Sequence, residues 1–189
     1  MSLTVRERGD VVSTFRWIEV RLMELLAAWV PTTPEMEAKL LFGAHIWDAA
    51  QHADAFGKRT HELRLPLHHG LEPSKGYVDL VDEIAATAET NKRIAAYYDA
   101  LLPDLEARFE EYLKGVDQLL DAPTVRILDR IRFELQRIVG DSRSLREELP
   151  DLALKDDAWV DNLRERLTGL GDVVQYRPER SSVSEPADA

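Results

Sequence analysis

Residues 34–56 read PEMEAKLLFGAHIWDAAQHADAF, and this stretch decides the fold that the sequence predicts. Thr33, Pro34 and Glu35 form a helix-start signal: a side-chain acceptor at the cap, proline at the first helical position and a carboxylate near the positive end of the helix dipole. At about 100° per residue, the apolar side chains that follow point in widely separated directions. We therefore expect a central helix over 34–56 that is buried nearly all round.

Apolar residues recur at the same three- and four-residue spacing on both sides of this stretch, whereas no segment alternates as a half-buried strand does. Pro103 is expected to bend or split the helical region that contains it. The further helices that the spacing predicts cover residues 10–29, 77–115, 121–148 and 156–167.

These helices and one long connection predict an all-α fold, an antiparallel four-helix bundle with a short extra C-terminal helix. An open helical bundle is the alternative. A chain of 189 residues fits one domain. We expect a flexible N-terminus over 1–9, a single helical-bundle domain over 10–174, and a disordered tail over 175–189, where the sequence is polar and contains proline.

Charge and composition exclude several classes of function. The chain has 24 Lys and Arg against 35 Asp and Glu, a formal net charge of −11. An acidic protein of this kind is poorly suited to bind nucleic acid or an anionic membrane surface. The absence of cysteine excludes disulfides, iron–sulfur clusters and thiol nucleophiles. No apolar run reaches the ~18 residues of a membrane span. We expect a cytoplasmic protein with neither a nucleic acid nor a membrane as its partner.

The sharpest chemical feature is a cluster on the expected second helix. His45, Asp48 and His52 are three and four residues apart, so they share an arc of about 60° on that helix. Neutral imidazole and carboxylate together suit iron, manganese or zinc. A structural network, in which Asp48 orients or ion-pairs a histidine, is an equally physical interpretation.

Carboxylates on the other helices could complete such a cluster. Glu19 lies at the margin of the apolar arc of the first helix, and Glu106 and Glu134 flank the apolar stripes of the third and fourth. Each is either a ligand or a solvated edge residue. Carboxylates that point inward need a metal or a charged partner, because a buried charge without compensation is costly.

This combination resembles the ferritin-like superfamily of di-metal carboxylate bundles, which uses one Glu on each of two helices and Glu-x-x-His on the other two. The resemblance implies that Glu19, Asp48, His52, Glu106 and Glu134 hold a metal, to which we add His45 from the cluster. It further implies iron, or manganese, and an oxidase or oxygenase acting on a small organic substrate.

Two departures from the family pattern weaken the second metal position. The second helix carries Asp-x-x-x-His, and the fourth has Arg137 where the family has histidine. A guanidinium stays protonated and offers no lone pair to a metal. Arg137 is instead expected to pair with Glu134 or Asp141, and Arg130 with Glu134.

The alternative function is therefore a metal-free bundle that serves as a binding or assembly protein. A sensor that binds a small molecule in its apolar interior is a third option. The aromatic residues of the first helix favour a homodimer.

Overall fold

The computed structural model describes residues 3–178, and within that range it is all-helical, as the sequence predicts. None of the described helices is long and apolar enough to cross a membrane. The helices are α1 (Val5–Trp29), α2 (Met36–Glu62), α3 (Lys75–Ala85), α4 (Thr90–Ile94), α5 (Leu102–Gly115), α6 (Ala122–Glu148) and α7 (Ala158–Gly169). A π-helical segment, Ala95–Leu101, joins α4 to α5.

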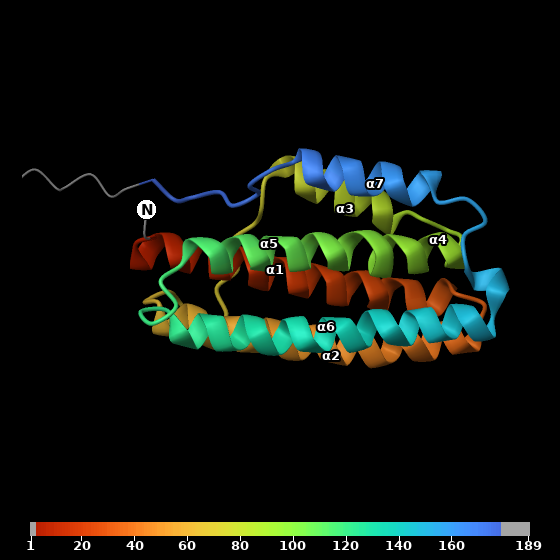
Figure 1. Ribbon diagram of the computed structural model, residues 1–189, viewed down its shortest axis with the longest axis horizontal. Helices are drawn as coiled ribbons and strands as arrows, with labels where there is room; N and C mark the ends of the chain where they lie inside the picture. The colour runs from red at the N-terminus through yellow and green to blue at the C-terminus, as the bar shows by residue number, and fades with distance from the viewer. Residues whose placement is uncertain (1–2, 179–189) are drawn as a thin grey trace, which may run out of the picture.

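The long helices lie side by side along the long axis of the molecule (Figure 1). Helix α1 packs on α2, α2 packs on α6, and α6 packs on α5. Helices α3 and α7 form an additional layer over α1, α5 and the π-helical segment. Trp29 of α1 fixes the position of α3, because its indole Nε1 donates a hydrogen bond to the Ala85 carbonyl oxygen at 3.1 Å.

Aromatic side chains from three helices form the centre of the core at one end. Phe15 of α1 packs edge-on against Phe109 of α5, with ring centroids 4.9 Å apart, and against Phe56 of α2 at 5.8 Å. All three rings are at most 3% exposed. Each such ring pair adds about 0.5–1.5 kcal/mol to the gain from burying the rings. These contacts therefore hold α1, α2 and α5 in a fixed register.

Helix α1 begins earlier than expected, at Val5 rather than Asp10. Thr4 and Glu7 form a reciprocal capping box, in which the Glu7 amide donates to Thr4 Oγ1 at 3.2 Å and the Thr4 amide donates to Glu7 Oε2 at 2.7 Å. Residues 5–9, predicted to be flexible, are thus helical. Asp10 is buried and accepts from the Arg177 amide and Nε.

Residues 175–178, the first of the expected tail, contact α1 and the connection that precedes α3. The Gln175 side-chain amide donates to the Pro73 carbonyl, and the Arg177 carbonyl accepts from Arg6 at 2.7 Å. The remaining residues of the expected tail, 179–189, lie outside the described range, as do residues 1 and 2.

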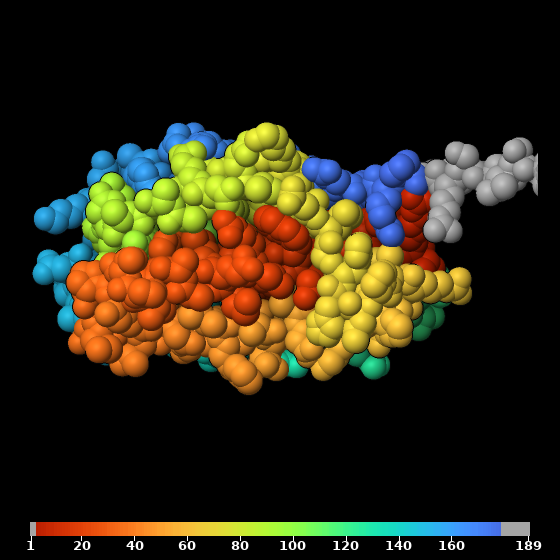
Figure 2. All heavy atoms as spheres, turned by 180° about the vertical axis from the view of Figure 1, so that it is seen from behind, coloured from red at the N-terminus to blue at the C-terminus, as the bar shows by residue number. Residues whose placement is uncertain are grey.

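Helix α2 is not buried all round. Leu40 and Trp47 are both 67% exposed and lie on its outer face, whereas Phe42 and Phe56 are fully buried. Apolar side chains lie on the exposed face of α2 as well as on its buried face, and for this reason its composition suggested a central position. The connection over 63–74 then passes across α1, where the Leu71 amide donates to the Ser13 carbonyl (yellow in Figure 2).

The third helical region divides at residues 86–89 rather than at Pro103. The Thr87 carbonyl in this break accepts from Arg93 Nε at 2.8 Å. Pro103 cannot donate to the carbonyl of Asp99, four residues earlier, because proline has no N–H. That carbonyl accepts instead from Arg164 Nε at 2.7 Å. The helix is therefore continuous across Pro103, with the π-helical segment directly before it.

Candidate functional site

The imidazole of His52 lies in the interior between α1, α2 and α6, held by a carboxylate at each ring nitrogen. Its Nδ1 is 3.1 Å from Glu19 Oε1, and its Nε2 is 2.9 Å from Glu134 Oε2. His52 and Glu19 are 2% and 1% exposed. Burial alone would lower the pKa of His52, but the charges and hydrogen bonds of both carboxylates outweigh it and raise the pKa to about 9. At neutral pH, His52 is an imidazolium that donates to both.

His45 lies two turns earlier on the same buried face of α2, but its surroundings differ. Its Nδ1 is 2.7 Å from the Tyr98 hydroxyl and its Nε2 is 3.4 Å from Asp141 Oδ2. Burial lowers the pKa of His45, against the weaker opposing effect of Asp141 and Asp48. The neutral ring therefore accepts from Tyr98 at Nδ1 and donates to Asp141 from Nε2. Burial also raises the pKa of Tyr98, which stays a hydroxyl.

Arg137 lies between these two imidazoles on the α6 side of the interface. Its Nη2 contacts Asp48 Oδ2 at 2.8 Å, and its Nη1 contacts Asp141 Oδ2 at 3.1 Å. The hydrogen bond with Asp48 raises the pKa of the guanidinium further. The expected pairing of Arg137 with Asp141 is confirmed, and its second partner is Asp48 rather than Glu134. Glu134 pairs with Arg130 at 2.9 Å, as the spacing of four residues predicts.

Glu106, the remaining carboxylate of the expected set, lies apart from the imidazoles. Its Oε1 is 3.8 Å from Arg132 Nε, and its side chain is 34% exposed. The structure thus brings together Glu19, His45, Asp48, His52 and Glu134, which come from α1, α2 and α6. From the third helical region it is Tyr98, in the π-helical segment, that reaches the cluster.

The donor geometry does not fit the metal that the family resemblance implies. The two nitrogens of an imidazole point away from each other across the ring. Glu19 and Glu134 therefore approach opposite edges of the His52 ring. A metal ion bound to one ring nitrogen could be coordinated by only one of these two carboxylates. Asp48 faces a guanidinium instead of an open position. Among residues 3–178, no three His, Asp or Glu side chains are arranged to hold a metal ion.

The structure adds two residues and one crevice that the sequence did not predict as part of a site. Asp141 and Tyr98 complete the surroundings of His45. The sequence did contain an indication of both residues, because Asp141 lies seven residues after Glu134 and Tyr98 lies on a buried arc of its helix. A crevice between α1, α5 and residues 167–176 had no sequence signal, since the three segments that line it are far apart in the sequence.

Comparisons with protein-family models, with curated proteins and with solved structures find no match to this chain. The resemblance to the ferritin-like superfamily therefore rests on the residues named above and on the helical architecture.

Proposed function

We propose that this chain is a ferritin-like antiparallel four-helix bundle that functions without a metal, as a binding protein. The bundle consists of α1, α2, the helix over 90–115, and α6, with α7 as the short extra C-terminal helix. The proposal is supported by the order in which these helices pack and by the inward position of Glu19, His52 and Glu134 between α1, α2 and α6.

The double hydrogen bond of His52 is the observation that carries the metal-free assignment. A metal ligand must offer the lone pair of a neutral imidazole nitrogen. Both ring nitrogens of His52 already contact a carboxylate, at 3.1 and 2.9 Å, so a metal could ligate the ring only by displacing a proton and one of these carboxylates. Arg137 supplies a second fixed positive charge beside Asp48. Together these cations compensate the inward carboxylates, which is the task of the metal ions in a di-metal bundle.

Elemental analysis tests this proposal, on protein purified without a metal-affinity tag and then incubated anaerobically with ferrous iron. We expect less than stoichiometric iron and manganese in the wild type and in the double variant His45→Ala/His52→Ala. Stoichiometric metal in the wild type that is lost in the double variant would overturn the proposal.

That contrary result would favour the second candidate, an iron-dependent oxidase or oxygenase acting on a small organic substrate. The gathering of Glu19, His52 and Glu134 from three helices is the observation in favour of this candidate. Ligation would require one carboxylate to leave its imidazole nitrogen. Glu134, whose side chain is 24% exposed, is freer to move than Glu19, whose side chain is 2% exposed.

We also propose a homodimer, although its basis differs from the one expected. Phe15 and Trp29 of α1 are buried. A row of exposed apolar residues lies instead on α2, at Met36, Leu40 and Trp47, with Gly43 on the same stripe and open space above it. Their spacing of four, three and four residues is that of a coiled-coil seam. The substitution Trp47→Glu should therefore lower the sedimentation coefficient to that of a monomer, and an unchanged coefficient would contradict a dimer through α2.

We also propose that the protein is cytoplasmic and that neither a nucleic acid nor a membrane is its partner. A net charge of −11 and the absence of cysteine support a cytoplasmic protein that binds neither nucleic acid nor a membrane. Retention on immobilised duplex DNA at physiological salt, or on anionic vesicles, would contradict this.

A further inference from the structure

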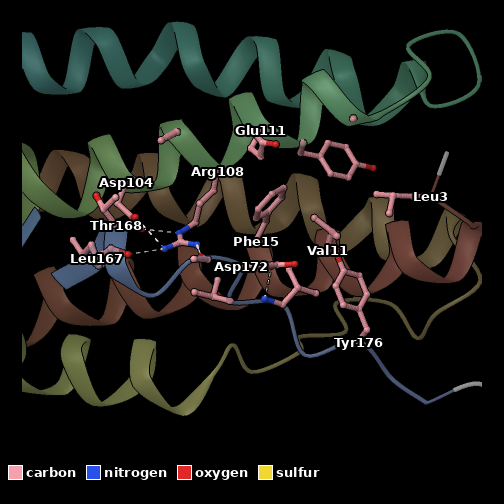
Figure 3. A pocket seen from close by; sticks show the side chains of 16 residues that line it. Leu3, Val11, Phe15, Asp104, Arg108, Glu111, Leu167, Thr168, Asp172 and Tyr176 are labelled. Carbon is pink, nitrogen blue, oxygen red and sulfur yellow. Dashed lines mark hydrogen bonds and ion pairs between the residues drawn. The ribbon is translucent and has the colours of Figure 1, made fainter. Parts of the chain in front are cut away.

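A crevice of about 660 Å³ opens between α1, α5 and the segment that follows α7, away from the His52 network (Figure 3). This volume lies within the range of about 300–1,000 Å³ that is usual for small-molecule sites. Its apolar wall includes Val11 and Phe15 of α1, Leu167 of α7 and Val173. A ligand that fills the crevice would thus place an apolar body against Phe15.

Arg108 connects the segments that line the crevice, and its hydrogen-bond donors are used within the chain rather than available to an anionic ligand. Its Nε and Nη2 donate to the two carboxylate oxygens of Asp104 at 2.8 and 3.0 Å, and its Nη1 donates to the Gly171 carbonyl at 2.8 Å. Nη2 also lies 3.4 Å from the Leu167 carbonyl. The guanidinium is therefore committed to its own chain, and the charge of Asp104 is neutralised.

Glu111 and Asp172 provide the remaining charges of the lining, and both are negative. In the view of Figure 3 the ring of Phe15 lies between these two side chains. Lys114 approaches Glu111 only at 3.7 Å, in an exposed pair of the kind that contributes little. An apolar lining that also carries two carboxylates matches a ligand that has an apolar body and a positive charge.

We propose that this crevice binds a small apolar amine, with the ammonium group between Glu111 and Asp172 and the apolar body on Phe15. The inference deepens the proposed binding function and rests on it. The crevice shares no residue with the His52 network, however, so the two can fail separately. Iron found at His52 would overturn the metal-free assignment alone, and a crevice without amine preference would overturn this inference alone.

Displacement of the neutral fluorescent probe N-phenyl-1-naphthylamine tests the proposal. Octylammonium, octanoate and 1-octanol share one apolar chain and differ in charge. We expect octylammonium to displace the probe at a concentration about fivefold or more below that of octanoate, a difference that increased salt reduces.

Three variants locate the site. The double variant Glu111→Gln/Asp172→Asn should remove the preference for octylammonium over 1-octanol, whereas Glu165→Gln, an exposed position on α7, should keep it. Ala107→Trp should fill the crevice and abolish probe binding, with a thermal melt to verify that each variant is folded. Equal displacement by the three compounds, or an unchanged preference in the double variant, would overturn the proposal.

Discussion

Arg137 of α6 contacts Asp48 of α2 through an Nη2 to Oδ2 distance of 2.8 Å, at the position where a ferritin-like bundle has a histidine. The contact gives Asp48 a partner with a permanent positive charge. The guanidinium therefore neutralises the charge of Asp48, and no metal ion is needed for this.

The substitution Arg137→His tests whether this guanidinium excludes a metal. It removes the positive charge and gives α6 the Glu-x-x-His pattern from Glu134 onward. We expect the variant to bind Co²⁺ at pH 7.5, seen as visible absorption in a titration, whereas the wild type shows none. If the variant also fails to bind while remaining folded, Arg137 is not the residue that excludes the ion.

The raised pKa of His52 predicts a specific dependence of stability on pH. The protonated ring is favoured in the folded state, with a pKa of about 9, relative to about 6.5 in the unfolded chain. Its contribution is complete below pH 6.5 and is lost as the pH rises to 9. We expect the free energy of unfolding in urea to fall by about 3 kcal/mol across this window.

His52→Gln should remove most of that dependence, and His61→Gln, at an exposed position on α2, should leave it intact. A wild-type profile that is flat between pH 6.5 and 9 would show that His52 is not charged in the folded protein.

The hydrogen bond between Tyr98 and His45 gives a prediction at the other imidazole. Tyr98→Phe removes the 2.7 Å partner of Nδ1 and leaves a buried nitrogen unsatisfied. We expect a loss of about 1–3 kcal/mol in the free energy of unfolding, measured in urea. Tyr97→Phe, in the adjacent buried ring, is the matched control and should cost less. Equal losses in the two variants would indicate that the hydrogen bond to His45 contributes nothing specific.

A buried ion pair between Asp121 and Arg59, at the end of the bundle near the α5–α6 connection, should contribute strongly to the free energy of unfolding. Asp121 is fully buried and accepts from Arg59 Nη2 at 2.7 Å and from the Thr124 hydroxyl at 2.8 Å. Asp121→Ala removes the buried carboxylate partner of Arg59 and leaves it only the exposed Glu62, so we expect a loss of about 3–5 kcal/mol. Asp79→Ala breaks an exposed pair with Lys75 and should cost far less in the same denaturation experiment. Similar losses would contradict the importance of burial here.

The spacing of apolar residues predicted the helices well, because that spacing arises from the same burial that forms the core. It placed His45 and His52 inward, and both are buried. It misjudged α2, since an exposed apolar stripe such as that of Leu40 and Trp47 cannot be told from a buried one by periodicity. The start of α1 was missed because the capping pair of Thr4 and Glu7 precedes the apolar stripe.

The partners of each site residue could be predicted only where they lie on the same helix. Arg130 with Glu134 and Arg137 with Asp141 follow from a spacing of four. The contact of Arg137 with Asp48 depends on the relative height of α2 and α6, which spacing within one helix does not determine.

The central claim is that His52 is a doubly hydrogen-bonded imidazolium, at a position where the resemblance to ferritin-like bundles implies a metal ligand. Nuclear magnetic resonance of the ¹⁵N-labelled ring tests it most directly, with the His52 signals assigned by comparison with His52→Gln. We predict that Nδ1 and Nε2 are both protonated at pH 7.5 and titrate together near pH 9. A ring with a single protonated nitrogen at pH 7.5, or one whose signals shift on addition of one equivalent of ferrous iron under argon, would contradict the account.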